Sequence, residues 1–122
     1  MSERIALKSL HLEYRIWIAE LNFDINLLRI FNDRLIELMA EKKNDAGSFE
    51  KKFDTSRTTI DELRHSMHIE KMNLAAIARE SKPDIHYENK IQENYKSIRD
   101  DFFKFRVSFN DLKGEFLRTE SK

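Results

Sequence analysis

The chain contains no cysteine, only two glycines, one proline and one valine. Without cysteine it has no disulfide framework, no thiol nucleophile and no cysteine-ligated zinc site. The scarcity of valine, glycine and proline removes residues typical of strands and tight turns, which disfavours all-β and α/β folds. No apolar run approaches the roughly 18 residues of a membrane span, and residues 1–4 lack a signal-peptide pattern. We therefore expect a cytoplasmic protein with no membrane partner.

Acidic and basic side chains balance, with 22 Lys and Arg against 22 Asp and Glu in 122 residues. Nucleic-acid binders usually carry a net basic surface, so we expect no nucleic-acid partner. The sequence has no glycine-rich phosphate loop, nucleophile elbow or His-Glu-x-x-His pattern, and nothing places serine, histidine and aspartate as a triad. These absences predict a non-enzymatic protein without catalytic residues or a cofactor.

Apolar residues recur at alternating steps of three and four through most of the chain, which is the spacing of one face of a helix. Two breaks interrupt this pattern: a polar cluster with glycine at 42–48, and the stretch 81–84, which holds the only proline. Both breaks carry residues typical of helix ends and turns. They divide a single domain, 1–122, into three predicted helices at about 3–43, 47–81 and 84–118.

Each predicted helix carries one apolar seam with a repeat of about 3.5 residues, which is typical of coiled-coil-like heptad packing. Three such seams with short connections predict an all-α fold, an elongated antiparallel (up-down-up) three-helix bundle. Aligning the seams sets residue i of the first helix against roughly 91 − i of the second, and residue j of the second against 165 − j of the third. The seam residues are Leu7, Leu10, Tyr14, Trp17, Leu21, Leu28, Phe31, Leu35 and Leu38, then Phe49, Phe53, Ile60, Leu63, Met67, Leu74 and Ile77, then Ile91, Tyr95, Ile98, Phe102, Phe105, Phe109, Leu112 and Phe116.

Three polar residues in the seams form a buried polar layer as one candidate site. Asp24 and Glu70 occupy seam positions about one layer apart, and Tyr95 lies at the level of Glu70. An unpaired buried carboxylate costs several kcal/mol unless it is paired or protonated. One interpretation is a buried acid site in which Tyr95 donates a hydrogen bond to a carboxylate. The other is a polar layer that fixes the register of the helices, or carboxylates that lean outward to water.

Carboxylates and histidines on bundle helices also raise the question of a metal centre. A di-iron site needs a Glu from each of two helices and a Glu-x-x-His pair from each of two others. This chain supplies one such pair, Glu62 and His65, and both side chains should point away from the seam. His65 and His68 share one helical turn, but histidines at this spacing on a surface are more often solvated than metal-bound. We therefore expect no metal site.

The first predicted helix carries a second apolar series outside its seam, so that most of its circumference is apolar between residues 12 and 31. Two partner helices cannot cover such a helix fully, and exposed contiguous apolar patches mark interaction sites. The second helix adds three apolar residues at about the same level. The predicted interface consists of Leu12, Ile16, Ala19, Phe23, Leu27 and Ile30 on the first helix, with Ile69, Met72 and Ala76 on the second.

The sequence thus favours an interaction or scaffold protein that forms a homodimer through this stripe, with another protein as an alternative occupant. It leaves open that the first helix bends so that its own bundle covers both series. A smaller series on the third helix, Phe103, Val107 and Leu117, either widens the core or serves a second contact. The alternative function is a small-molecule or metal-binding helical bundle that uses Asp24, Glu70 and Tyr95.

Overall fold

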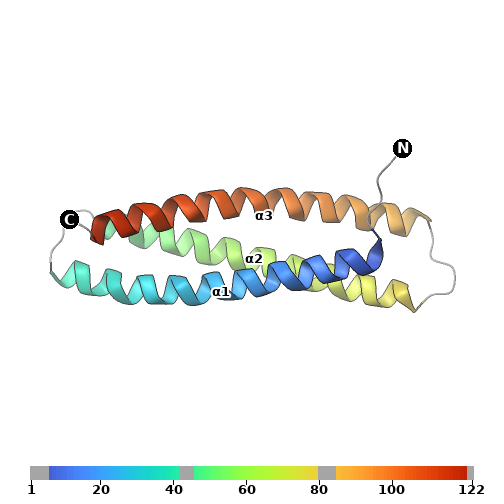
Figure 1. Ribbon diagram of the computed structural model, residues 1–122, viewed down its shortest axis with the longest axis horizontal. Helices are drawn as coiled ribbons and strands as arrows, with labels where there is room; N and C mark the ends of the chain where they lie inside the picture. The colour runs from blue at the N-terminus through green and yellow to red at the C-terminus, as the bar shows by residue number, and fades with distance from the viewer. Residues whose placement is uncertain (1–5, 42–45, 80–84, 121–122) are drawn as a thin grey trace.

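The computed structural model describes residues 6–41, 46–79 and 85–120. Three long helices run lengthwise: α1 (Leu7–Ala40), α2 (Gly47–Ala78) and α3 (Ile85–Glu120). They alternate in direction and form an elongated bundle, with no strand among these residues (Figure 1). The predicted all-α three-helix bundle is therefore confirmed.

The helix bounds differ from the predicted ones by a few residues. Glu41 and Arg79 lie in turns, so α1 and α2 end before the predicted 43 and 81, whereas α3 continues two residues beyond 118. The remaining predicted ends, at 3–5, 42–43, 80–81 and 84, lie outside the described residues. At the end of α1 the Glu41 backbone N–H still donates to the Glu37 carbonyl, 3.0 Å away, which closes the last turn.

The core consists of the predicted seams. Every seam position is buried, apart from Leu7, which packs partly exposed against the core. Aromatic rings fill both halves of the bundle: Trp17 stacks on Tyr95 in one half, and Phe31 lies beside Phe116 in the other. The ring centroids in these pairs are 5.6 and 5.0 Å apart, distances at which aromatic packing adds to the stabilisation from burial.

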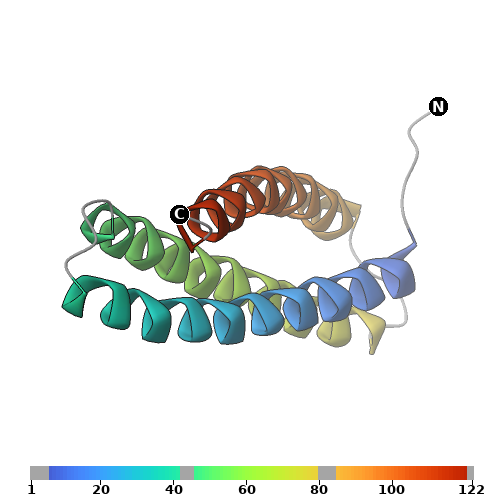
Figure 2. The ribbon, with the colours of Figure 1, turned by 60° about the vertical axis from the view of Figure 1, so that its left-hand side comes forward.

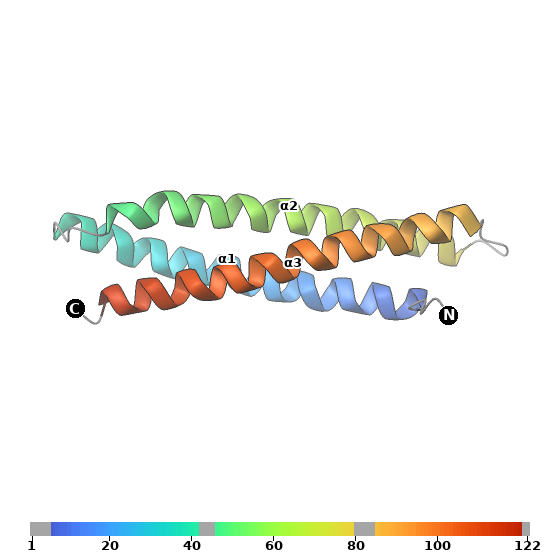
Figure 3. The ribbon, with the colours of Figure 1, turned by 90° about the horizontal axis from the view of Figure 1, so that it is seen from above.

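The helix α2 packs closely along both of its neighbours, whereas the backbones of α1 and α3 approach each other less closely. Turning the molecule shows α3 set apart from the layer that α1 and α2 form (Figure 2). Seen from above, α3 is inclined to the other two helices (Figure 3). Contact between α1 and α3 therefore depends on long side chains.

The axial register of α1 differs from the predicted one. The Phe31 ring of α1 packs against Phe53 of α2, with 6.1 Å between the ring centroids, and Arg64 of α2 donates a hydrogen bond to Asn22 of α1. Facing residues therefore have numbers that add up to about 84–86, not 91. This shifts α1 by about five to seven residues, roughly 8–10 Å, against α2. The α2–α3 register agrees with the predicted value, since Asn94 donates to Glu70. A repeating seam matches itself again after each repeat, so its spacing alone does not fix the register.

Candidate functional site

The second apolar series of α1 lies on the surface. Leu12, Ile16, Phe23 and Ile30 are 53–65% exposed, and Ala19 is exposed beside them. Leu27 is half-buried and packs against the core. The exposed residues follow seam residues by two positions, which is a rotation of about 200° around the helix axis. They therefore point away from the core, and the bundle does not cover both series of α1.

The predicted α2 members of the interface are also exposed, but they do not all join the stripe on α1. Ile69 and Met72 are 43% and 70% exposed, and Ala76 is exposed. Ile69 lines a shallow hollow between α2 and α3, together with Asn94 and Ser97 of α3. The structure thus places Ile69 on the side of α2 that faces α3, away from the stripe of α1.

The apolar series on α3 does not widen the core. Phe103, Val107 and Leu117 are 44%, 64% and 55% exposed. The ring of Phe103 meets Trp17 of α1 edge-on, with 6.2 Å between the ring centroids. Phe103 therefore lies beside α1, and the α3 series adds exposed apolar side chains on the α3 side of the gap between these two helices.

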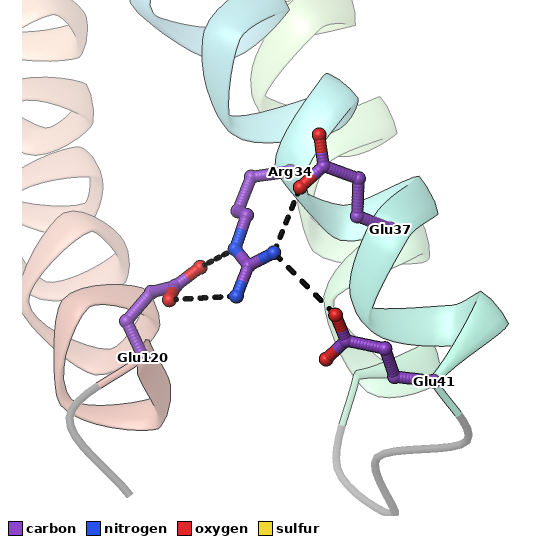
Figure 4. Close-up of polar contacts among 4 residues, drawn as sticks. All are labelled: Arg34, Glu37, Glu41 and Glu120. Atoms are coloured by element: carbon purple, nitrogen blue, oxygen red, sulfur yellow. Dashed lines mark hydrogen bonds and ion pairs between the residues drawn. The ribbon is translucent and has the colours of Figure 1, made fainter.

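Ion pairs bridge α1 and α3 along this gap. Arg106 donates two hydrogen bonds of 2.9 Å to the carboxylate of Glu20, and its guanidinium lies over the rings of Phe102 and Phe103. Two heptads further along each helix, Arg34 bonds Glu120 through two nitrogens. Arg34 also contacts Glu37 of its own helix and Glu41 in the turn that follows, so one guanidinium interacts with three carboxylates (Figure 4). The hydrogen bonds that Arg34 donates to the carboxylates of Glu120 and Glu37 raise its pKa, so it stays charged.

Glu70, one of the predicted polar residues, is buried with 7% of its surface exposed. Its Oε1 accepts a hydrogen bond of 2.9 Å from the Asn94 side chain. Its Oε2 is buried and has no hydrogen-bond partner among the described residues. Burial raises the pKa of Glu70, while the amides of Asn94 and Asn73 and the charge of Lys90 act in the opposite direction. Glu70 borders an open hollow of about 350 Å³ between α2 and α3, lined also by Tyr87 and Ile91.

Tyr95 is buried, and its hydroxyl hydrogen-bonds with Glu13 of α1 and with Arg99 of its own helix. Burial and this acceptor raise the pKa of Tyr95 to about 12. Tyr14, fully buried beside Tyr95, interacts electrostatically with both Glu70 and Glu13. Its hydroxyl has no hydrogen-bond partner in the described part of the chain, and burial raises its pKa. Glu13 and Tyr14 were not predicted as members of this group, because the predicted register placed other residues of α1 there.

Asp24 is buried in a different environment. Its electrostatic neighbours are Glu20 on its own helix and Lys113 and Arg106 on α3. Burial, assisted by Glu20, raises the pKa of Asp24 to about 6, against the opposing effect of the two cations. The structure brings Glu70 and Tyr95 together around Tyr14, and it gives Asp24 separate neighbours at the α1–α3 contact.

The described residues contain no group of three or more His, Asp or Glu side chains placed to hold a metal ion. No helix within the described ranges is long and apolar enough to cross a membrane. The chain matches no family model, and neither curated protein sequences nor solved structures show a significant similarity to it. The candidate sites are therefore the exposed apolar surface of α1 and the polar group around Glu70.

Proposed function

We propose that this protein is a non-enzymatic interaction module that associates with a second copy of itself through the apolar stripe of α1. The observation that carries this proposal is the exposure of Ile16, Phe23 and Ile30, each more than half accessible on the face opposite the core. Scattered exposed apolar residues are normal on soluble proteins, but a row of them along one helix marks a contact surface.

The balanced charge of the chain supports a protein partner over a nucleic acid. The absence of cysteine is compatible with the reducing cytoplasm, where we expect this association to take place. In this function the helical bundle holds the stripe in place, and the apolar side chains of the stripe make the contacts with the second copy.

Light scattering on a sizing column tests the proposal, since it returns a molar mass without assuming a spherical shape. We expect a mass near twice 14.7 kDa for the wild-type chain and near 14.7 kDa for Phe23→Glu. A matched control is Ile85→Glu, which adds the same charge at a side chain that is 56% exposed near the start of α3. This control should remain dimeric. A wild-type mass of one chain at high protein concentration would refute self-association.

A second candidate function, binding of a small polar molecule or a metal ion, is favoured by Glu70. Its buried Oε2 lacks a partner among the described residues, and its carboxylate borders an open hollow. Thermal unfolding with and without added Zn²⁺ tests the metal version. This candidate predicts a higher Tm with Zn²⁺ for the wild type and no shift for Glu70→Gln. Equal shifts for both chains would count against Glu70 as a ligand.

A further inference from the structure

We propose that the homodimer is antiparallel and forms through a face shared by α1 and α3, with its two-fold axis at the level of Phe23 and Asn110. This inference rests on the proposed self-association and replaces α2 by α3 as the second contributing helix. The α1/α3 face is defined here by Ile16, Phe23 and Ile30 of α1 and by Phe103 and Leu117 of α3.

These residues border the row of ion pairs that joins the two helices. Phe23 lies one helical turn after Glu20, and Ile30 lies one turn before Arg34; both charged residues reach α3. Residues three or four positions apart are neighbours on a helix surface, so the apolar side chains stand beside the ion pairs. On α3, Phe103 lies one helical turn before Arg106, and Leu117 lies one turn before Glu120. All five are exposed, which places them on the outward side of the gap.

The opposite side of the α1 stripe is polar. Arg15, Asn22 and Arg29 line it at intervals of seven residues, and all three are exposed. Asn22 already accepts a hydrogen bond from Arg64 of α2. The apolar surface therefore continues from α1 toward α3 and stops at a polar border toward α2.

The α1/α3 face has the symmetry that an antiparallel pair requires. The contacts Trp17–Phe103, Glu20–Arg106 and Arg34–Glu120 all join residues 86 positions apart, so Phe23 and Asn110 lie within one residue of the same level. Ile16 and Ile30 are each seven residues from Phe23. Phe103 and Leu117 are likewise seven residues from Asn110.

The proposed two-fold axis lies in the plane of the interface, runs across α1 and α3, and passes them at the level of Phe23 and Asn110. Rotation about this axis packs α1 against α1 of the second copy and α3 against α3 of the second copy, in antiparallel orientation. Phe23 then meets its own equivalent, and so does Asn110. Ile16 meets Ile30 of the second copy, and Phe103 meets Leu117 of the second copy. Such a contact is isologous and closed, so it stops at two chains.

The charges around the face complement each other in this arrangement. Exposed Lys8 and Lys96 border one end, while Asp33 and Glu37 border the other. Lys8 is 15 residues from Phe23 and Glu37 is 14, so the two-fold axis brings a lysine of one copy near a glutamate of the other. The cluster of Arg34 with Glu37, Glu41 and Glu120 adds net negative charge at the acidic end, because three carboxylates surround one guanidinium. A parallel pair would place like charges together, which disfavours it.

The apolar area is sufficient for a stable dimer. A half-exposed aromatic or large aliphatic side chain leaves on the order of 100 Å² accessible to solvent. The five residues of the face, with neighbouring Leu12 and Val107, thus offer an area close to the roughly 800 Å² per partner of a standard interface.

Cross-linking through single cysteines tests the arrangement, because the chain has no cysteine of its own. Phe23→Cys, Asn110→Cys and Met72→Cys replace exposed residues on α1, α3 and α2, so none disturbs the core. With a short bismaleimide linker, we expect dimers on a denaturing gel for Phe23→Cys and Asn110→Cys, and none for Met72→Cys. A cross-link at Met72→Cys and none at Asn110→Cys would overturn the role of α3 while leaving self-association intact.

Orientation is tested by a mixture of Ile16→Cys and Ile30→Cys chains. Equivalent Ile16 positions lie about 21 Å apart in the antiparallel pair, since each is seven residues from the axis. We expect cross-linked dimers in the mixture and none from Ile16→Cys alone. Efficient linking of Ile16→Cys to itself would show a parallel pair and overturn the proposal. A wild-type mass of one chain would instead refute the proposed function and this inference together.

Discussion

The guanidinium of Arg106 donates one hydrogen bond of 2.9 Å to each carboxylate oxygen of Glu20, which lies 86 positions earlier in the chain. The same guanidinium lies over the rings of Phe102 and Phe103, at 4.6 and 5.3 Å from their centroids. Because the backbones of α1 and α3 make few close contacts, this bidentate and stacked arginine is a principal link between them.

Arg106→Ala should lower the free energy of unfolding by about 1 kcal/mol. Its side chain is 41% exposed, so solvent screens much of the ion pair, and the loss of packing on the two rings adds to the effect. Urea unfolding measures the change. The matched control, Arg57→Ala, removes an exposed pair with Asp54 within α2 and should have a smaller effect. Equal effects of the two substitutions would contradict the importance of the α1–α3 link.

Asp24 should make the protein less stable as the pH rises from about 4 to about 6. Its pKa is 3.8 in the reference state and about 6 in the folded state, so the folded chain binds more protons between these values. The free energy of unfolding therefore falls across this window, by at most about 3 kcal/mol for this group. Glu70, whose pKa is also raised, acts in the same direction.

Asp24→Asn removes this titration. At pH 7.5 we expect the variant to have a higher free energy of unfolding than the wild type, because it buries no charge. At pH 4 the two chains should be nearly equally stable, since Asp24 is then protonated. Urea unfolding at both pH values measures the difference, and Asp33→Asn, at an exposed position of α1, is the control. A difference between Asp24→Asn and wild type that does not change with pH would rule out the raised pKa.

The buried hydroxyl of Tyr14 should contribute nothing to stability. It finds no hydrogen-bond partner among the described residues, whereas the ring packs 5.8 Å from Trp17 and 6.1 Å from Tyr95, between centroids. Tyr14→Phe keeps the ring, so the free energy of unfolding should stay the same or rise by about 1 kcal/mol. Tyr95→Phe, which loses the hydrogen bond to Glu13, should instead lower it by a similar amount. Thermal unfolding compares the two, and a loss of stability in Tyr14→Phe would reveal a partner for its hydroxyl.

The positions that face the core could be predicted from the sequence because each helix repeats one apolar spacing without long gaps. Even the polar seam residues Asp24 and Glu70 are buried as their positions require. The axial fit of α1 could not be predicted, since a repeating seam is compatible with several registers. The wrong register placed Asp24 next to Glu70, which the structure separates, and it hid Glu13 and Tyr14, whose places depend on which residues of another helix lie opposite. Side chains such as Arg106 and Glu20, 86 positions apart, carry no local signal of their pairing.

The odd number of helices has a mechanical consequence. Because α1 and α3 run in the same direction, Leu7 and Glu120 lie at opposite ends of the molecule (Figure 1). A helix of 36 residues is about 54 Å long, so groups attached near these two residues are held apart by a rod of that order. The length of the bundle thus sets the distance between these two points, and a donor–acceptor pair of dyes attached there would report any change in that distance.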